Sequence, residues 1–271
     1  MMRKLVLTGS ALAIALLAGE AAQAISYGVN DEQEHPMVGV LLDCSDDGRG
    51  NESCYVSCTG SLLQGREGGL ADGKDVFLTA THCVTDYEPK GTLKVTFDEV
   101  YNASSSILYT GLEYYDERYF TEPCYGYETA VIVLDRSPGL PYASLTTEGY
   151  LDDLKSNHEL KDQMFATVGF GQTRTSKKNA WQALFGSGRR LKADQEAQSL
   201  QASWFILKIN QGNGGTCWAD SGNPHFVEGT FQVVSLGVYG DPNCKNQDKT
   251  YRVDTAETRE FLAEFVDLPL E

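Results

Sequence analysis

The first residue whose neighbours suggest chemistry is Ser221, in the run Gly-Gly-Thr-Cys-Trp-Ala-Asp-Ser-Gly-Asn-Pro at residues 214–224. Glycines on both sides let the backbone turn sharply, Cys217 can pin the loop, and Asp220 has no basic residue beside it in the sequence. A serine hydroxyl on such a turn becomes a nucleophile when a general base lies within hydrogen-bond reach. Taken alone, Asp-Ser-Gly is more typical of an ordinary surface turn than of a nucleophile.

A candidate base is His82, in the run Thr-Ala-Thr-His-Cys at residues 79–83. Imidazole transfers protons well because it can gain or lose a proton near neutral pH. A lone histidine is usually structural, but this one adjoins a cysteine and follows a predicted strand that ends in Phe-Leu-Thr. Together Ser221 and His82 predict acyl transfer to water, provided that the fold brings the two side chains together.

These motifs resemble those of the trypsin/chymotrypsin-like serine proteases. That family has Thr-Ala-Ala-His-Cys around its base, where Thr81 is the one change here, and Gly-Asp-Ser-Gly-Gly-Pro around its nucleophile, where Ala219 and Asn223 replace glycines. The family also has an aspartate just before an apolar strand, in the pattern Asp-Ile-Ala-Leu-Leu. Glu128 occupies that place, ahead of the apolar residues 130–134.

The resemblance implies a division of roles among these residues. Ser221 attacks a peptide carbonyl, His82 takes the serine proton, and Glu128 orients the imidazole, while the backbone N–H groups of Ala219 and Ser221 meet the oxyanion. Two departures from the family pattern bear on activity, namely the extra methylene of Glu128 and the Cβ of Ala219. The alternative to a secreted serine endopeptidase is therefore a weak or inactive homologue that serves as a binding or adhesion protein.

Further site residues follow from the same resemblance. The family's mature chain begins with Ile or Val, and its ammonium group pairs with the acid before the nucleophile, so the expected pair is Ile25 with Asp220. Ser26 and Tyr27 depart from the family's Val-Gly-Gly, and the alternative is that Ile25 starts a disordered tail. Because trypsin-like members that select Arg or Lys carry an aspartate in place of Gly215, specificity stays open. The substrate-pocket residues that the resemblance implies are Gly215, Ser235, Gly237 and Asp248.

Residues 1–24 have the pattern of a cleaved secretory signal. Arg3 and Lys4 precede an apolar run at residues 5–18, and Ala-Gln-Ala at residues 22–24 precedes the expected cut. The run is too short to read as a membrane span. We therefore expect a protein secreted to an extracellular or periplasmic space, without membrane insertion.

The net charge and the composition limit the classes of molecule that the protein could bind. Removing residues 1–24 takes away two basic residues and one acidic residue, which changes the formal net charge from -16 to about -17. Such a surface repels nucleic acid, which we therefore do not expect as a partner. The resemblance implies protein or peptide substrates, and we expect a monomer. No cofactor is expected, and no metal site, since His82, His158 and His225 lack ligand spacing.

The chain from residue 38 to residue 80 alternates short apolar runs with Gly, Asp, Asn and Ser clusters, without a sustained helical period. This pattern predicts an all-β fold. With the resemblance, we expect two six-stranded antiparallel β-barrels of the chymotrypsin type and a C-terminal helix. Residues 172–201 are polar and weakly patterned, which predicts exposed loops. The expected boundaries are a protease domain at 25–271, with barrels at about 25–140 and 141–253 and a helix capped by Thr255 at about 254–267.

Seven cysteines in an exported chain predict a disulfide framework with one cysteine left over. The resemblance implies a Cys58–Cys83 disulfide, since the run from Cys58, Cys-Thr-Gly-Ser-Leu, is similar to the family's Cys-Gly-Gly-Ser-Leu. It also implies a Cys217–Cys244 disulfide. Pairing Cys44 with Cys54 would close a hairpin and leave Cys124, which lies four residues before the triad acid.

Overall fold

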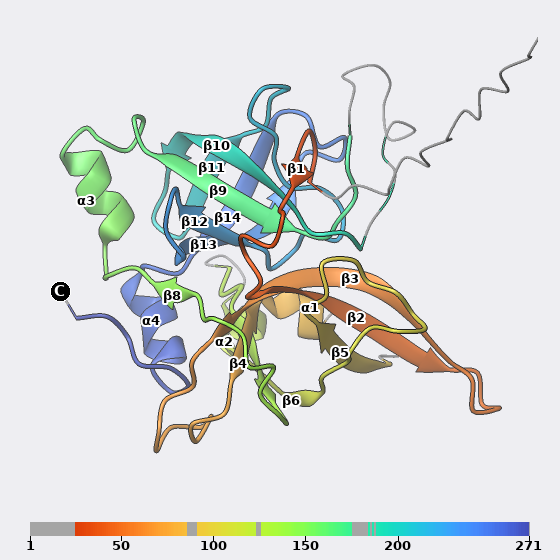
Figure 1. The fold of residues 1–271 in the computed structure, drawn as a ribbon. Coiled ribbons are helices and arrows are strands. Elements are labelled where there is room, and N and C mark those ends of the chain that lie inside the picture. The colour runs from red at the N-terminus through yellow and green to blue at the C-terminus, as the bar shows by residue number, and fades with distance from the viewer. Residues whose placement is uncertain are drawn as a thin grey trace, which may run out of the picture.

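The computed structural model describes residues 25–85, 91–122, 126–174, 184, 186 and 188–270. The predicted signal segment at residues 1–24 lies outside them. Two β-barrels lie side by side, with short helices at their edges (Figure 1). The predicted fold class, two antiparallel barrels with a C-terminal helix, is confirmed.

The first barrel is a six-stranded antiparallel sheet in the order β5-β2-β3-β4-β7-β6. An isolated bridge between Val95 and Tyr109 brings its two ends toward each other. The β2–β3 hairpin is longer than the rest and projects from the barrel (Figure 1). The strands of the first barrel are β2 (Val38–Asp46), β3 (Glu52–Leu63), β4 (Val76–Thr79), β5 (Thr92–Thr96), β6 (Gly111–Tyr115) and β7 (Ala130–Leu134).

The second barrel closes on itself, because β10 pairs with both β11 and β9 in the order β10-β11-β14-β13-β12-β9. Two short strands, β1 (Val29–Asn30) and β8 (Ser144–Leu145), pair with β10 and β13 at its margins. The six strands of the ring are β9 (Met164–Gly169), β10 (Leu191–Leu200), β11 (Trp204–Lys208), β12 (Pro224–Val227), β13 (Gln232–Gly240) and β14 (Gln247–Arg252).

Strand β7 shows why the apolar run at residues 130–134 folds as it does. It pairs with β4 on one side and β6 on the other, and all five of its residues are buried. A strand enclosed in this way favours branched apolar side chains at every position. Its Ala-Val-Ile-Val-Leu sequence meets that demand, and the strand begins two residues after Glu128.

One expectation about the strands was wrong, and one strand was not predicted. Residues 191–200, predicted as loop, form β10, in which the buried positions between Leu191 and Leu200 hold the small or polar residues Ala193, Gln195 and Ala197. Strand β12 was not predicted, since its Pro-His-Phe-Val sequence follows the candidate nucleophile directly.

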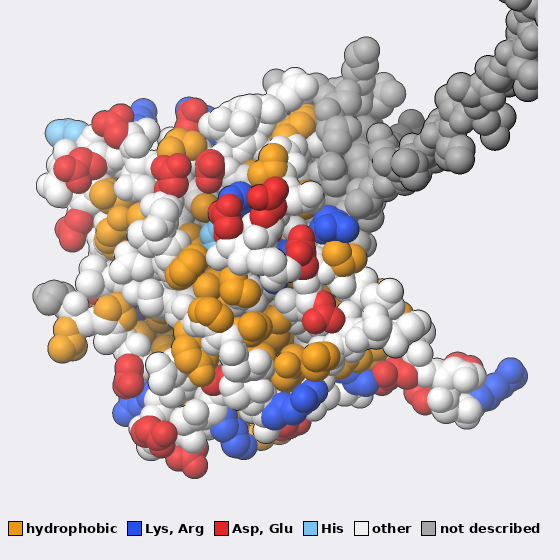
Figure 2. All heavy atoms as spheres, viewed as in Figure 1, with side chains coloured by type: hydrophobic (Ala, Val, Ile, Leu, Met, Phe, Trp, Pro, Cys, Tyr) orange, Lys and Arg blue, Asp and Glu red, His pale blue; other side chains and the backbone are white. Residues whose placement is uncertain are grey.

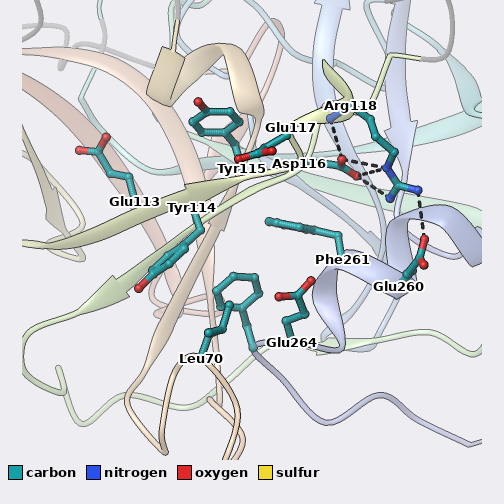
Figure 3. A pocket seen from close by; sticks show the side chains of 11 residues that line it. Leu70, Glu113, Tyr114, Tyr115, Asp116, Glu117, Arg118, Glu260, Phe261 and Glu264 are labelled. Atoms are coloured by element: carbon teal, nitrogen blue, oxygen red, sulfur yellow. Dashed lines mark hydrogen bonds and ion pairs between the residues drawn. The ribbon is translucent and has the colours of Figure 1, made fainter. Parts of the chain in front are cut away.

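Four short helices occur in the described residues: α1 (Thr81–Thr85), α2 (Arg118–Thr121), α3 (Tyr150–Ser156) and α4 (Ala256–Leu262). Thr255 caps α4 by accepting a hydrogen bond from the Thr258 N–H. Arg118 bonds Asp116 and reaches Glu260 on α4, which ties the end of the chain to the first barrel (Figure 3). The cavity of about 620 Å³ beside this contact contains none of the predicted catalytic residues.

A buried arginine also joins the two barrels. Arg190, just before β10, is fully buried, and its Nε lies 2.9 Å from Asp31 Oδ2. Its Nη1 donates to the carbonyl oxygens of Val38 and Phe97 in the first barrel, at 3.0 and 3.2 Å. Asp31 also lies 2.5 Å from His35 Nδ1, and its hydrogen bonds to His35 and the nearby Arg190 hold the pKa of Asp31 below its ordinary value despite burial.

On the surface, acidic and basic side chains are interspersed on the face in view rather than gathered by sign (Figure 2). Among the helices of the described residues, none combines the length and hydropathy that a membrane span requires.

Candidate active site

His82 lies in α1, the short helix that follows β4. The Cys58–Cys83 disulfide, with a Cα–Cα distance of 6.1 Å, attaches this helix to β3. Thr81 Oγ1 donates to the carbonyl oxygen of Tyr127 at 2.9 Å, so α1 is also held to the segment that carries Glu128. The imidazole is therefore fixed from two sides, while 16% of its side-chain surface stays exposed.

Glu128 places its carboxylate behind the imidazole. Its Oε2 accepts from the backbone N–H of His82 at 3.3 Å and lies 3.0 Å from Nδ1. The preceding residue, Tyr127, adopts a positive φ of 43°, and Glu128 is only 1% exposed. The additional methylene has therefore not removed the acid from the histidine, and the carboxylate–imidazole pair is well shielded from water.

Ser221 lies on a loop that packs against the first barrel. Its carbonyl oxygen accepts from the Thr59 N–H at 2.8 Å, and the next N–H, that of Gly222, donates to Gly237 O at 2.7 Å. Gly222 has φ +80°, and a Cβ there would lie 2.1 Å from Thr79 Oγ1, so glycine is required at this position.

The serine and the imidazole line one cavity of about 280 Å³. Within the described part of the chain, however, the structure has no hydrogen bond between the Ser221 hydroxyl and His82. Such bonds are often long in unliganded sites and shorten when substrate binds. The structure therefore brings the acid and the base into contact and places the serine in the same cavity.

Ala219 adopts the positive φ that glycine usually takes in such a turn, with φ 72°. Its carbonyl oxygen accepts from Thr59 Oγ1 at 3.2 Å, which fixes the loop. In the described ranges the N–H groups of Ala219 and Ser221 donate no hydrogen bond. Both N–H groups are thus available to an oxygen atom bound in the cavity.

Asp220 is fully buried, and its carboxylate accepts from the N–H groups of Gly171 and Cys217 at 2.7 and 2.9 Å. Burial raises the pKa of Asp220 to about 8. Ile25 is fully buried too, and a Cβ built on Gly169 would lie 2.1 Å from Asp220 Oδ1 and 3.2 Å from Ile25 Cδ1. The two side chains therefore converge on one point.

The backbone beside Ile25 belongs to the site as well. Ser26 forms an antiparallel bridge with Gly215, with N···O distances of 2.8 and 3.0 Å in the two directions. The carbonyl oxygen of Ile25 accepts from Thr173 Oγ1 at 2.6 Å. The beginning of the described chain is thus ordered against the loop that carries the nucleophile.

The residues predicted for the substrate pocket divide into two groups. Gly237 lines the active-site cavity, whereas Ser235 is buried and bonds Thr250 Oγ1 at 2.8 Å. Asp248 lies behind the cavity wall, where its Oδ2 would be 2.9 Å from a Cβ on Gly215. Thr216, which does line the cavity, donates its N–H to Asp248 at 2.9 Å.

A buried polar chain extends behind Asp248, and the sequence did not reveal it. Gln195 Nε2 donates to Asp248 Oδ2 at 2.6 Å, and His225 Nε2 lies 3.1 Å from Gln195 Oε1. Burial raises the pKa of Asp248 to about 6 and lowers that of His225 to about 3, so His225 is neutral at physiological pH. Apolar and charged residues alternate at the start of β10, and this alternation places Gln195 at an inward-facing position. That pattern was the sequence feature that could have indicated the buried chain.

The structure has three disulfides among the described cysteines: Cys44–Cys54, Cys58–Cys83 and Cys217–Cys244. Cys124 lies outside the described residues. Of His82, His158 and His225, only His82 belongs to a group of ligand-type side chains in the described chain, and its neighbours there, Cys58 and Cys83, are disulfide-bonded to each other. The other such group among the described residues is Glu52 with the disulfide-bonded Cys44 and Cys54.

Comparisons with known proteins agree with this architecture. The family model for trypsin matches residues 47–259, and no curated protein sequence matches the chain. Among solved structures, the Vibrio cholerae VesB protease has a TM-score of 0.58 and 17% identity, covering 89% of this chain and 67% of its own.

Two further structures cover nearly all of both chains. HL collagenase has a TM-score of 0.59 and 15% identity, over 90% of this chain and 96% of its own. A mutant of human heparin binding protein (CAP37) has a TM-score of 0.61 and 15% identity, over 88% and 95%. At sequence identities of 15 to 17%, the similarity to these structures supports a shared fold alone.

Proposed function

The chain belongs to the trypsin family, and on that premise we propose that it is a secreted serine endopeptidase that hydrolyses peptide bonds through Ser221, His82 and Glu128. The observation that carries the proposal is the 3.0 Å contact between His82 Nδ1 and Glu128 Oε2. A buried carboxylate in this position fixes the tautomer of the imidazole and offsets the charge that it acquires during catalysis.

The reaction proceeds through an acyl-enzyme. Ser221 Oγ bonds to the carbonyl carbon of the substrate while His82 Nε2 takes the hydroxyl proton. The tetrahedral intermediate then breaks its C–N bond, and His82 returns the proton to the departing amine. Water repeats the sequence on the ester and releases the acid and free Ser221.

The oxyanion of the intermediate is met by the N–H groups of Ala219 and Ser221. Fixed backbone dipoles of this kind each contribute about 3 to 4 kcal/mol in the transition state. The positive φ of Ala219 supports this role, because the residue already has the backbone conformation that its glycine counterpart favours. The Cβ of Ala219 therefore need not turn the N–H away.

Cleavage after residue 24 completes the site. A buried carboxylate without a cation is costly, and so is a buried ammonium, but the two compensate each other. The Ile25 side chain and the Asp220 carboxylate lie close to the same point beside Gly169, which supports a pairing of the new ammonium group at Ile25 with Asp220. Removal of the signal segment thereby orders the loop that carries Ser221.

The pocket beside Ser221 takes its preference from Asp248. Its carboxyl group lies behind Thr216 and Gly215, so in the ionised form it favours a cationic side chain on the substrate. We expect the protein to act on protein or peptide substrates as a monomer.

Labelling with a phosphonyl fluoride tests the proposal. A chain that begins at Ile25 should be modified stoichiometrically at Ser221, and the Ser221→Ala variant should not react. The alternative is a binding protein on the same scaffold. Absence of labelling in protein that unfolds cooperatively and retains its disulfides would refute the peptidase and favour that alternative.

A further inference from the structure

Glu128 has two carboxylate oxygens, and the contact with His82 uses one of them. Oε2 accepts both hydrogen bonds from His82, and Oε1 faces the other way. A buried carboxylate needs donors on both oxygens, because each unsatisfied lone pair has lost its water. The residue that donates a hydrogen bond to Oε1 therefore helps to fix the position of the carboxylate.

That donor is Tyr239. Its hydroxyl donates to Glu128 Oε1 at 3.3 Å, and no other described residue bonds this oxygen. Its ring is nearly parallel to that of His82, with an interplanar angle of 14° and a centroid separation of 6.5 Å. Tyr239 is 53% exposed, whereas Glu128 is 1% exposed, so the tyrosine lies between the acid and solvent.

The strand geometry explains how this side chain reaches the acid. The β13–β14 register shifts between Gly237, opposite Thr250, and Tyr239, opposite Lys249. Such a bulge re-aims the side chain that follows it. Tyr239 is then supported by Trp204, at a centroid distance of 5.8 Å, and Lys249 Nζ lies 4.0 Å from the Trp204 centroid.

We propose that Tyr239 is a positioning residue for the triad: by holding Oε1, its hydroxyl keeps the longer acid Glu128 in line behind His82. The inference rests on the proposed peptidase function. The other β13 hydroxyl predicted for the site, that of Ser235, accepts a hydrogen bond from Thr250 Oγ1 at 2.8 Å and, among the described residues, makes no hydrogen bond with Glu128.

The first test replaces Tyr239 with phenylalanine, which removes the hydroxyl and keeps the ring. We expect kcat on a peptide substrate to fall about tenfold, as for a lost hydrogen bond to a charged group, while KM changes less than about twofold. The matched control is Tyr55→Phe, since Tyr55 is 52% exposed and its hydroxyl donates to Asp43 Oδ2 at 2.8 Å in the β2–β3 hairpin. The control should leave both constants unchanged.

A double-mutant cycle separates positioning from general damage. In Glu128→Asp the carboxylate is one methylene shorter, so the Tyr239 hydroxyl no longer reaches it. Adding Tyr239→Phe should then cost less than about twofold, although it costs about tenfold in the wild type. Independent, multiplying effects would overturn the inference.

Proton NMR supplies a readout that does not depend on turnover. The His82 Nδ1–H resonance should move in Tyr239→Phe and stay in place in Tyr55→Phe. An unchanged resonance with an unchanged kcat overturns the role of Tyr239. Failure of the wild type to react with the phosphonyl fluoride overturns the peptidase instead, and the NMR comparison still decides the contact.

Discussion

A chain that keeps one residue ahead of Ile25 should lose stability as the pH rises, whereas a chain that begins at Ile25 should be protected. The cause is Asp220, which burial keeps protonated to about pH 8 when no ammonium group pairs with it. The comparison requires two proteins, one starting at Ala24 and the other at Ile25, so that a single residue separates them.

The sign follows from proton binding. Because the folded-state pKa of Asp220, about 8, exceeds the ordinary 3.8, the folded chain binds this proton more tightly than the unfolded chain does. The stability that the carboxyl group contributes is complete below about pH 4 and is lost as the pH rises to 8. At about 1.4 kcal/mol per pKa unit, the loss is on the order of 5 kcal/mol.

Urea unfolding at pH 4.5, 6 and 8 measures this difference. Asp248 also has a raised pKa, but it contributes equally to both proteins and cancels when they are compared. Asp220→Asn in the Ala24 chain removes the titrating group and should flatten the additional pH dependence. If both chains have the same slope, or if Asp220→Asn keeps it, the reasoning about the pair of Asp220 and Ile25 is refuted.

Two further predictions concern the pocket and the loop that flanks it. Burial raises the pKa of Asp248 to about 6, so the carboxyl group gains its charge as the pH rises through that value; the ratio of kcat/KM for Lys over Leu at the cleavage position should rise between pH 5 and 7. In the Asp248→Asn variant this ratio should no longer change with pH. If the ratio still rises, an acid other than Asp248 is responsible. Replacing Cys217 and Cys244 by serine opens a crosslink with a sequence separation of 27 residues, and urea unfolding should show a loss of about 3 to 4 kcal/mol. A loss below about 1 kcal/mol would mean that the crosslink adds little to the folded loop.

Sequence reasoning identified the parts of the site that lie in short, contiguous motifs. His82 and Ser221 each stand among neighbours whose types suit the chemistry, and the apolar run of β7 fixed the place of Glu128. Those motifs do not give the distances between the three side chains in the folded protein. Whether a longer acid still meets the imidazole depends on the backbone at Tyr127, whose positive φ no local pattern announces.

The residues missed by sequence reasoning lie where packing overrides local pattern. Gln195 faces inward on β10, a strand whose buried positions are partly small or polar, so its period was not recognised. Tyr239 reaches Glu128 because of a register shift between two strands, and such shifts are set by pairing across the barrel. The shift thereby brings Tyr239 to Glu128, which is 111 positions away in the sequence, and composition and spacing do not encode such a contact.

The buried guanidinium of Arg190 has a consequence for how the molecule comes apart. Separating the barrels would strip this buried cation of its two carbonyl acceptors in the first barrel, those of Val38 and Phe97. A state with one barrel intact and the other melted is therefore strongly disfavoured. Heating should produce a single calorimetric transition, in which the cleft between the barrels is lost at the same temperature as the barrels themselves.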